Sequence, residues 1–358
     1  MKKQYYIDLH AIQTVPPSCI NRDDTGSPKT AVYGGVERAR VSSQAWKRVI
    51  REYFKRIYAA DELGVRTKRI PELLAGEIRK SSGQMDEASS MKEALEVLKI
   101  VGISIDKKNK DQNAALFFIS HEQIKALAEL KAKGENDKKV YEKALTDHPS
   151  FDIVLFGRMV ADVPNLNYDA AAQVAHAIST HAVHTEYDYF TAVDDMQDDT
   201  NSGAAHLDTV EFNSATLYRY ATLNVSELVS HLGADSAKVV RGFIEAFVRS
   251  MPTGKQNTFA NRTLPDMVYI TVREDQPINL SGAFENAIKN TKEGYAVKSC
   301  ETMLSYAEKM YHSFADEPKY AFGCGDSAIL AGHAETLPLK ELLNRMESVA
   351  SDICSEEE

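Results

Sequence analysis

Apolar residues recur every three or four positions between residues 42 and 58. Trp46, Val49, Ile50, Tyr53, Phe54 and Ile57 fall on one face of a 3.6-residue period, which is typical of an amphipathic helix. Ser42 and Ser43 precede this pattern, and a short hydroxyl side chain can accept a hydrogen bond from a free N–H at a helix start. We therefore predict a helix over residues 42–58.

Other patterns before residue 150 predict one strand, one long loop and a helical insertion. Residues 4–14 alternate apolar and polar side chains, which favours a half-buried strand. The Pro- and Gly-rich residues 15–35 predict a loop, and loops of this length are often functional. Residues 61–150 are rich in Lys, Glu, Ala and Leu, with Gly and Ser breaks near 81–83 and 102–104. The clearest helix of this insertion is predicted over 120–134.

The second half of the chain predicts alternating strands and helices. We expect a strand over 151–160, a helix over 168–183, a hairpin over 186–222, a helix over 235–251 and a strand over 267–274. Without its insertions, the order is strand, helix, strand, helix, hairpin, helix, strand. This order is compatible with an α+β, RRM-like (ferredoxin-like) core, although the consensus RRM signature is absent.

Composition places the chain among globular proteins. Its 358 residues are 43% hydrophobic and 26% charged, enough for one large domain or two. The first ten residues contain no apolar signal core, and no apolar run has the length of a membrane span. The four cysteines are scattered, which favours a reducing compartment. We expect a cytoplasmic protein without a membrane partner.

Charge singles out the segment 36–58. The chain has a formal net charge of −10, yet this segment carries seven cations against Glu37 and Glu52. Gln44, Lys47, Arg48, Arg51 and Lys55 fall on the face opposite the apolar stripe, and Gln44 to Lys55 spans roughly 16 Å of helix. Such a face either is simply solvated or meets an anionic partner, for which phosphate is the obvious candidate.

Three groups of titratable residues remain open to more than one interpretation. Asp23 and Asp24, beside Arg22, either bind a divalent metal or form a turn neutralised by the arginine, and we favour the turn. His176, His181 and His184, near the end of the predicted helix 168–183, are expected to be packed or capping residues rather than metal ligands. Four acidic residues at the predicted hairpin tip indicate solvation or contact with a basic surface of a neighbour: Asp194, Asp195, Asp198 and Asp199.

A set of short strings occurs in order along the chain, from the first strand to about residue 272. The strings include PSCINRDD (17–24), Gly34-Gly35, RVSSQ (40–44), Lys47-Arg48, GRM (157–159), AHAISTH (175–181), FTAVDD (190–195), AHL (205–207), YRYA (218–221), GKQ (254–256) and PDMV (265–268). Together they resemble the CasC family, the repeated backbone subunits of type I-E CRISPR Cascade complexes in the RAMP superfamily.

This resemblance implies a hand-shaped protein without chemistry of its own. The RRM-like palm would comprise residues 1–60, 151–185 and 214–358, the last with a C-terminal helical tail. Residues 61–150 would form helical fingers and residues 186–213 a β-hairpin thumb. Copies would stack head to tail along CRISPR RNA, displace a nucleotide at regular intervals and present the rest to target DNA, with other Cascade subunits as further partners. No cofactor, metal or catalytic residue is implied.

The resemblance also implies a set of RNA contacts. Phosphates would be held by the turn at Ser42, Ser43 and Gln44, by Lys47 and Arg51, and by Arg22. Met159 would wedge against bases, and Phe190 and Thr191 would cover the displaced nucleotide. The remaining expected contacts are Lys29, Arg40, Arg48, Lys255 and Gln256. Trp46 is expected to anchor the palm, since it lies on the apolar stripe.

Two rival functions remain open from the sequence. One is a metal-dependent ribonuclease that uses Asp23 or Asp24, because backbone relatives in type III complexes cut target RNA from an Asp in the corresponding loop. The other is a stand-alone RRM-like RNA-binding protein. Contact of the acidic hairpin tip with the basic surface of a neighbouring copy is a further hypothesis.

Overall fold

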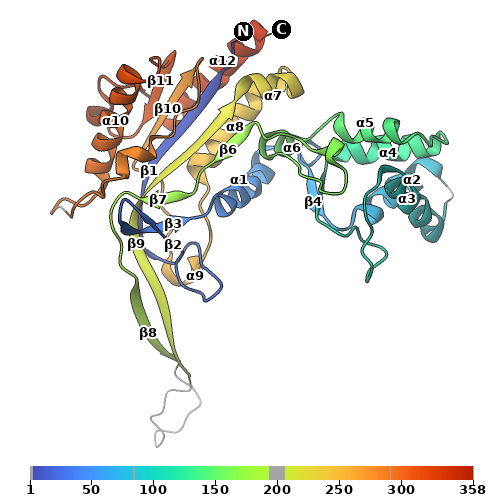
Figure 1. Cartoon of the computed structure of the whole chain (residues 1–358), viewed down its shortest axis with the longest axis horizontal. Coiled ribbons are helices and arrows are strands. Elements are labelled where there is room, and N and C mark those ends of the chain that lie inside the picture. Colours follow the sequence, from blue (N-terminus) through green and yellow to red (C-terminus); the bar gives the residue numbers. More distant parts are fainter. Residues whose placement is uncertain (1–2, 84, 193–205, 291, 358) are drawn as a thin grey trace, which may run out of the picture. The chain divides into compact units, whose positions relative to one another are not determined.

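The computed structural model describes residues 3–83, 85–192, 206–290 and 292–357 (Figure 1). The chain divides into two compact units. Unit 1 comprises residues 1–50, 174–222 and 243–349, and unit 2 comprises residues 51–173, 223–242 and 350–358. Several elements, among them α1 (Ser43–Ile57) and α8 (Asp235–Arg249), contribute residues to both units.

Ten strands within the described residues form one mostly antiparallel sheet. Its main order is β12-β11-β10-β1-β9-β7-β3-β2, and β6 and β8 both pair with β9. The strands are β1 (Tyr6–Ser18), β2 (Thr30–Tyr33), β3 (Val36–Val41), β6 (Ala172–Val174), β7 (Ala177–Ser179), β8 (Glu186–Ala192), β9 (His206–Asn224), β10 (Met267–Arg273), β11 (Tyr320–Cys324) and β12 (Glu335–Thr336).

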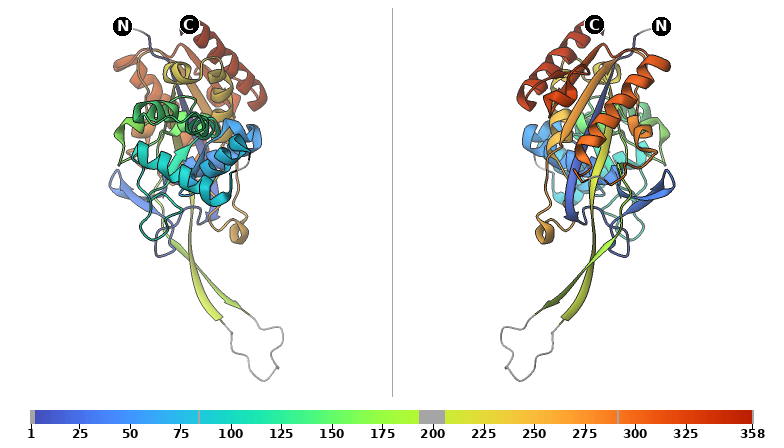
Figure 2. Two further views of the ribbon diagram at one scale, coloured as in Figure 1. Left: turned by 90° about the vertical axis from the view of Figure 1, so that its right-hand side faces the viewer. Right: turned by 90° about the vertical axis from the view of Figure 1, so that its left-hand side faces the viewer.

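The centre of this sheet has the predicted RRM-like topology. The elements β1, α1, β7, β9, α8 and β10 follow one another in a β-α-β-β-α-β order, and their strands lie in the sheet order β10-β1-β9-β7. Together with the helices of unit 2 and the β8–β9 hairpin (Figures 1 and 2), this confirms the predicted α+β class with palm, fingers and thumb.

Both faces of the central sheet are covered in unit 1. Successive side chains of β9 alternate between faces, so Leu217 packs with Trp46 of α1 while Tyr218 and Tyr220 pack on the other side. That second face is buried under η3 (Leu280–Phe284) and α10 (Ala296–Ser313). The aromatic residues that an ordinary RRM sheet exposes to RNA are therefore core residues here. The remaining helices of unit 1 are α9 (Gln256–Phe259), α11 (Ser327–Leu330) and most of α12 (Leu339–Glu357).

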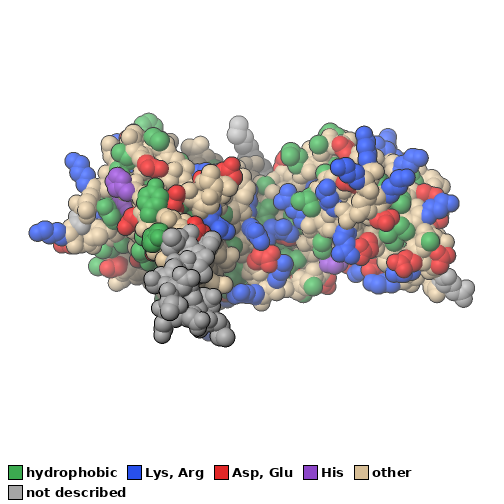
Figure 3. All heavy atoms as spheres, turned by 90° about the horizontal axis from the view of Figure 1, so that it is seen from below, with side chains coloured by type: hydrophobic (Ala, Val, Ile, Leu, Met, Phe, Trp, Pro, Cys, Tyr) green, Lys and Arg blue, Asp and Glu red, His purple; other side chains and the backbone are tan. Residues whose placement is uncertain are grey.

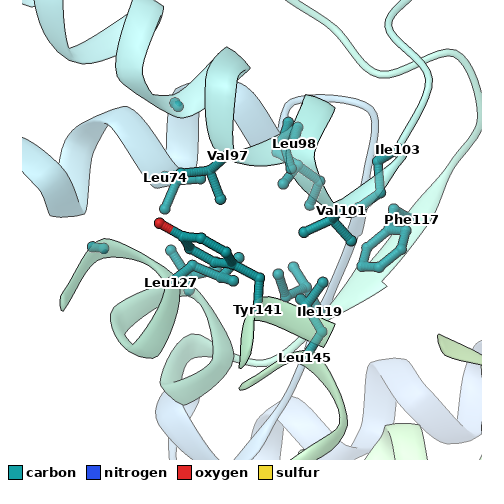
Figure 4. Close-up of a cluster of buried hydrophobic side chains, with 14 of the residues drawn as sticks. Leu74, Val97, Leu98, Val101, Ile103, Phe117, Ile119, Leu127, Tyr141 and Leu145 are labelled. Carbon is teal, nitrogen blue, oxygen red and sulfur yellow. The ribbon is translucent and has the colours of Figure 1, made fainter. Parts of the chain in front are cut away.

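Unit 2 is largely helical, with its own core around Tyr141 (Figure 4). The Tyr141 ring lies among aliphatic side chains, and its hydroxyl donates to the Glu135 carbonyl at 3.0 Å. The elements of unit 2 are η1 (Ala60–Glu62), β4 (Val65–Thr67), α2 (Ile70–Ser82), α3 (Glu87–Val101), β5 (Phe117–Ile119), α4 (His121–Ala132), α5 (Lys138–Thr146), α6 (Phe151–Phe156), η2 (Pro164–Leu166) and α7 (Val225–Leu232).

Local signals fix several helix ends at their predicted places. Gly83 and Gly102 end α2 and α3 in the left-handed conformation, at the two predicted breaks. Ser120 starts α4 through a capping box with Gln123. The surface of this unit mixes signs, and Lys and Arg side chains are interspersed with Asp and Glu at the right of Figure 3.

Three sequence predictions of secondary structure were wrong. Residues 151–156 form helix α6 rather than a strand, because a short apolar run that is buried all round has no distinguishing period. Residues 168–183 contain strands β6 and β7 rather than a helix, because pairing with β9 overrides the local helix preference of alanine. The expected loop 15–35 holds the end of β1 and all of β2.

The β2–β3 hairpin turns through Gly34 and Gly35, which have φ of +60° and +76°. Two positive φ values are typical of the tight hairpin turn that matches strand twist. A Cβ on Gly34 would lie 1.6 Å from the Glu285 carbonyl oxygen, so only glycine fits there.

Among the described residues, no helix has both the length and the apolar character needed to span a membrane.

Candidate functional site

An open groove of about 800 Å³ lies in unit 1 at the start of α1. We call it the α1 groove, and three segments form its walls. They are the loop after β1, the first two turns of α1, and the loop after α8. The lining residues are Ile20, Asn21, Arg22, Asp23, Asp24, Thr25, Gly26, Ser42, Gln44, Ala45, Arg48, Val49, Pro252, Thr253, Gly254 and Lys255.

Hydrogen bonds join the loop after β1 to the start of α1. The Asn21 Oδ1 atom accepts from the Ser42 N–H at 2.8 Å. Ser42 Oγ accepts from the Ala45 N–H at 3.3 Å, so Ser42 is the predicted helix cap. The Ser42 side chain is buried and its hydroxyl is used inside the protein. Its contribution to the groove is therefore the placement of the helix start.

The α1 groove carries more positive than negative charge. Arg22 and Arg48 are exposed, and within the described ranges neither side chain has an ion-pair partner. Lys255 is half-buried beside them, against the exposed carboxylates of Asp23 and Asp24. The first turn of α1 contains no acidic residue, and a helix start carries partial positive charge and free N–H groups. Guanidinium, ammonium and amide donors together suit an anion such as phosphate.

Asp23 shapes the loop that carries Arg22. Its Oδ1 atom accepts from the Thr25 N–H at 2.9 Å, the Thr25 hydroxyl at 2.7 Å and the Ser27 N–H at 3.0 Å. These hydrogen bonds, the one from the Thr25 hydroxyl first, lower the pKa of the Asp23 carboxyl. This geometry agrees with the turn interpretation. Within the described part of the chain, no group of three or more His, Cys, Asp or Glu side chains is arranged to hold a metal.

The loop after α8 reaches the groove through a close backbone approach. A Cβ on Gly254 would lie 2.5 Å from the Ile20 carbonyl oxygen and 2.6 Å from that of Cys19. Lys255 follows with φ of +50°, at the N-terminal end of α9. The string Gly-Lys-Gln contained this signal, but sequence reasoning used only Lys255 and Gln256. Gly254, Thr253 and Pro252 were missed as wall residues.

Gln44, Ala45, Arg48 and Val49 of α1 line the groove, and the two polar ones, Gln44 and Arg48, are one helical turn apart. Ser43, the first residue of α1, is half-buried and is not among the lining residues. Lys47 is not in the lining, and partial burial lowers the pKa of its ammonium group. The predicted helix face is thus divided, with Gln44 and Arg48 at the groove.

Arg51 has its partners in unit 2. Its guanidinium forms an ion pair with Asp152 at 3.0 Å and lies over the Phe118 ring at 4.4 Å. The Asp152 side chain is buried and also accepts from the Gly64 N–H and the Ser150 hydroxyl. Arg51 therefore has a structural partner that the charge pattern along the chain did not reveal.

Lys29 and Arg40 lie at a separate, smaller cavity next to the β2–β3 hairpin. The Arg40 Nε atom donates to the Thr30 carbonyl at 3.1 Å, and its NH1 atom lies 3.2 Å from His176 Nδ1. These contacts hold the hairpin and the segment before β7 together. Neither residue lines the α1 groove.

The thumb residues lie on the β8–β9 hairpin. Phe190 pairs with Asp208 and Thr191 with Leu207, and the hairpin extends beyond the sheet (Figure 2). Adjacent strand residues point to opposite faces, so Phe190 and Thr191 lie on different faces of the thumb. Asp194, Asp195, Asp198 and Asp199 are outside the described residues.

In the Gly-Arg-Met string of unit 2, the arginine is buried and the methionine is exposed. Arg158 donates to the carbonyls of Leu166, Phe118 and Leu145 and to Gln123 Oε1. Burial lowers the pKa of Arg158 to about 10. The Met159 side chain is 86% exposed.

Gln256 is half-buried at the first position of α9.

The three histidines do not share a helix, because His176 lies between β6 and β7 and the other two follow β7. His181 Nε2 accepts from the Thr216 N–H at 3.1 Å, and its ring stacks on Tyr295 at 3.7 Å. Burial lowers the pKa of His181. Burial also lowers the pKa of His176, and the nearby cations Arg40 and Lys29 lower it further. His184 is exposed. His181 is thus a packed residue, as expected from the sequence.

Comparisons with known proteins agree with this fold. The family model described as CT1975-like protein (Cas_CT1975) matches residues 7–349. A chain of a solved structure titled "CRISPR RNA-guided surveillance complex, pre-nicking" is 34% identical, with a TM-score of 0.84 over 96% of this chain and 100% of that chain. A second, titled "CRISPR RNA-guided surveillance complex", is 30% identical, with a TM-score of 0.74 over 96% and 99%. No curated protein sequence matches. The chain belongs to the CT1975-like family of Cas proteins.

Proposed function

We propose that this protein is a non-catalytic backbone subunit of a type I-E CRISPR surveillance complex. Several copies would bind the spacer part of CRISPR RNA through its phosphates, kink it at intervals and present it for pairing with target DNA. The subunit would work in the cytoplasm with other Cascade subunits. The similarity to two chains of RNA-guided surveillance complexes supports this assignment.

The observation that carries the proposal is the α1 groove. Arg22, Arg48 and Lys255 come from three separate segments and meet around the amide-rich start of α1. Phosphate contacts of this kind hold a nucleic acid without reading its sequence. Such contacts suit a protein whose target is specified by base pairing of a bound guide.

The same groove favours the non-catalytic proposal over the ribonuclease alternative. One oxygen of Asp23 already accepts three hydrogen bonds within its own turn. Asp24 is exposed at the groove, and within the described residues it belongs to no group of three or more His, Cys, Asp or Glu side chains that could hold a metal. Hydrolysis of a phosphodiester by metal ions needs such a set to fix the metal beside the scissile phosphate.

Copurifying nucleic acid tests the proposal. The wild-type protein should carry RNA of one discrete length, and a variant with Arg22→Ala, Arg48→Ala and Lys255→Ala should lose it. For single-stranded RNA, the slope of log affinity against log salt should fall by about 2, at roughly 0.7 per lost phosphate contact. A matched control removes the same charge from an exposed loop of unit 2, through Lys107→Ala, Lys108→Ala and Lys110→Ala.

Three results would contradict parts of the proposal. An unchanged salt slope in the groove variant would remove the groove from the binding site. RNA of mixed lengths would favour a stand-alone RNA-binding protein. Magnesium-dependent cutting of complementary RNA that is lost in Asp23→Ala or Asp24→Ala would establish the ribonuclease.

A further inference from the structure

Arg219 of β9 is a fully buried cation inside unit 1. Its guanidinium lies between two aromatic rings, with Cζ 3.8 Å from the centroid of Trp46 and 4.5 Å from that of Phe247. It donates to Gln13 Oε1 at 2.6 Å and to the Phe247 carbonyl in the last turn of α8. Both acceptors are neutral, and burial lowers the pKa of Arg219 to about 9.

Gln13 of β1 relays this contact to the far end of the loop after α8. Its side chain is fully buried. While Oε1 accepts from Arg219, Nε2 donates to the Thr263 carbonyl at 3.0 Å and contacts the Thr263 hydroxyl at 3.1 Å. The Thr263 hydroxyl in turn donates to the Thr14 carbonyl at 2.9 Å. One amide side chain therefore couples Arg219 to Thr263, which lies just after the loop and before β10 begins at Met267.

The network holds both ends of residues 250–262, which we call the 250–262 loop. Arg219 binds the carbonyl that precedes the loop, and Gln13 binds the residue that follows it. Between these ends, Gly254 contacts the loop after β1 and Lys255 lines the α1 groove. Phe259 of the same loop packs on Phe212 of the thumb strand at 5.8 Å. The loop thus joins the groove to the base of the thumb.

Arg219 also fixes a second wall of the groove. Trp46, on which it stacks, lies in α1 between the groove residues Ala45 and Arg48. The cation consequently contacts α1 directly through Trp46. It is linked to the two residues that flank the 250–262 loop, to Phe247 by its own hydrogen bond and to Thr263 through Gln13.

A purely structural role explains this arrangement poorly. Burying a guanidinium without a carboxylate is unfavourable, and well-packed apolar residues often replace buried charges without loss of stability. The Arg219 Nε atom is also buried without a hydrogen-bond partner among the described residues. The geometry is better explained by the need to set the distance between two walls of one groove.

We propose that Arg219 and Gln13 are positioning residues for the α1 groove, which place Lys255 opposite α1 for contact with consecutive phosphates of one RNA strand. This inference rests on the proposed function, because it assigns these residues to the same binding site. Neither residue touches the RNA itself.

Two variants separate positioning from stability. Gln13→Glu keeps an acceptor for Arg219 and adds a neutralising charge, yet its carboxylate cannot donate to the Thr263 carbonyl. Arg219→Met fills the space between the rings without either hydrogen bond. We measure thermal unfolding, amide exchange in the 250–262 loop, and the affinity of the full-length protein for a fluorescent single-stranded RNA over a salt series.

We expect Gln13→Glu to keep the wild-type Tm within a few degrees, whereas Arg219→Met should lower the Tm because two buried acceptors lose their donor. Both variants should show faster amide exchange in the 250–262 loop. RNA affinity should fall about ten-fold. The slope of log affinity against log salt should fall by about 0.7, the value for one lost phosphate contact. Unchanged affinity and slope would overturn the inference, and so would a loss of affinity that only follows a loss of Tm. Lys255→Ala is the reference. If it changes the slope and Gln13→Glu does not, positioning fails and the proposed function stands. If Lys255→Ala and Arg48→Ala change nothing, the proposed function fails as well.

Discussion

The guanidinium of Arg219 lies 3.8 Å from the ring centroid of Trp46, the only tryptophan of the chain. The indole is 2% exposed, and its Nε1 atom has no hydrogen-bond partner within the described residues. A cation above an indole face is favourable, and more so where water is excluded. The ring face thus matters more to this site than the indole N–H does.

Trp46→Phe should be much milder than Trp46→Ala. Phenylalanine keeps an aromatic face for Arg219 and removes an unpaired buried N–H, so we expect a loss below about 1.5 kcal/mol of unfolding free energy. Alanine leaves a cavity beside a buried cation and should cost about 3–5 kcal/mol. Urea unfolding followed by circular dichroism measures both. Equal losses in the two variants would show that the aromatic face has no special role.

Arg48→Ala and Arg51→Ala should affect different properties, although the residues are one turn apart. Arg48 is exposed without an ion-pair partner among the described residues, so its loss should change the unfolding free energy by less than about 0.5 kcal/mol. It should lower the RNA salt slope by about 0.7. Arg51→Ala strands the buried Asp152 carboxylate and should cost about 2–4 kcal/mol. A lower salt slope in a stably folded Arg51→Ala protein would restore Arg51 to the RNA site.

The contrast between Arg48 and Arg51 shows what sequence reasoning could reach. The helix 42–58 was predictable because its period and its Ser42 cap are local properties of the chain. Of the groove cations, Arg48 followed from local charge, whereas Arg22 and Lys255 followed from the family resemblance. The partner of Arg51 is 101 residues away, and only the tertiary fold reveals it. A charge pattern therefore identifies the helix that carries a site but cannot say which cations are free.

The wrong secondary-structure predictions have the same origin. Ala172, Ala177 and their neighbours favour a helix locally, but β6 and β7 gain hydrogen bonds from β9, whose paired residues lie about forty positions later. The place of the 250–262 loop at the groove depends on Gly254 meeting a loop more than two hundred residues earlier. Long-range pairing of this kind leaves no periodic trace in the sequence.

Gly254→Ala should weaken RNA binding because an added Cβ has no room. It would approach two carbonyl oxygens of the loop after β1 within 2.6 Å, so the backbone must move and carry Lys255 with it. We expect about a ten-fold loss of affinity for single-stranded RNA. Gly76→Ala is the matched control, since nothing lies within 4 Å of its Cβ position in α2. The control should be neutral or stabilise by about 0.5–1 kcal/mol. Unchanged binding by Gly254→Ala would mean that the loop position is not critical.

Neighbouring residues of the Gly-Arg-Met string should separate stability from binding. Arg158→Met removes donors from three buried carbonyls, so we expect a loss of about 3–5 kcal/mol of unfolding free energy. Met159→Ala changes an exposed side chain and should alter stability by less than about 0.5 kcal/mol. If Met159 wedges between bases, its alanine variant should still reduce RNA affinity. Unchanged affinity would assign the string to folding alone.

Asp8 should make the stability of the protein depend on pH. The carboxyl is buried in β1, where it accepts from the Tyr220 hydroxyl and from the Ile278 N–H, both at 2.8 Å. Burial raises the pKa of Asp8 to about 6, above its usual 3.8, and these hydrogen bonds only partly oppose the shift. A raised carboxyl pKa means that the folded state binds its proton more tightly than the unfolded state. The stabilising contribution is therefore complete below pH 4 and is lost as the pH rises through about 6.

The test compares the wild type with Asp8→Asn, which is neutral at every pH. The unfolding free energy of the wild type, minus that of the variant, should increase on the order of 3 kcal/mol between pH 7 and pH 4. The difference between the two proteins is used because His10, on the same strand, changes the unfolding free energy with pH in the opposite direction to Asp8. Burial lowers the pKa of His10 to about 3, so its contribution is lost as the pH falls below 6.5. His10 is present in both proteins, and its effect cancels in the difference. A difference that stays constant from pH 4 to pH 7 would show that Asp8 titrates like an exposed carboxyl, and its burial under η3 and α10 would have to be incomplete in solution.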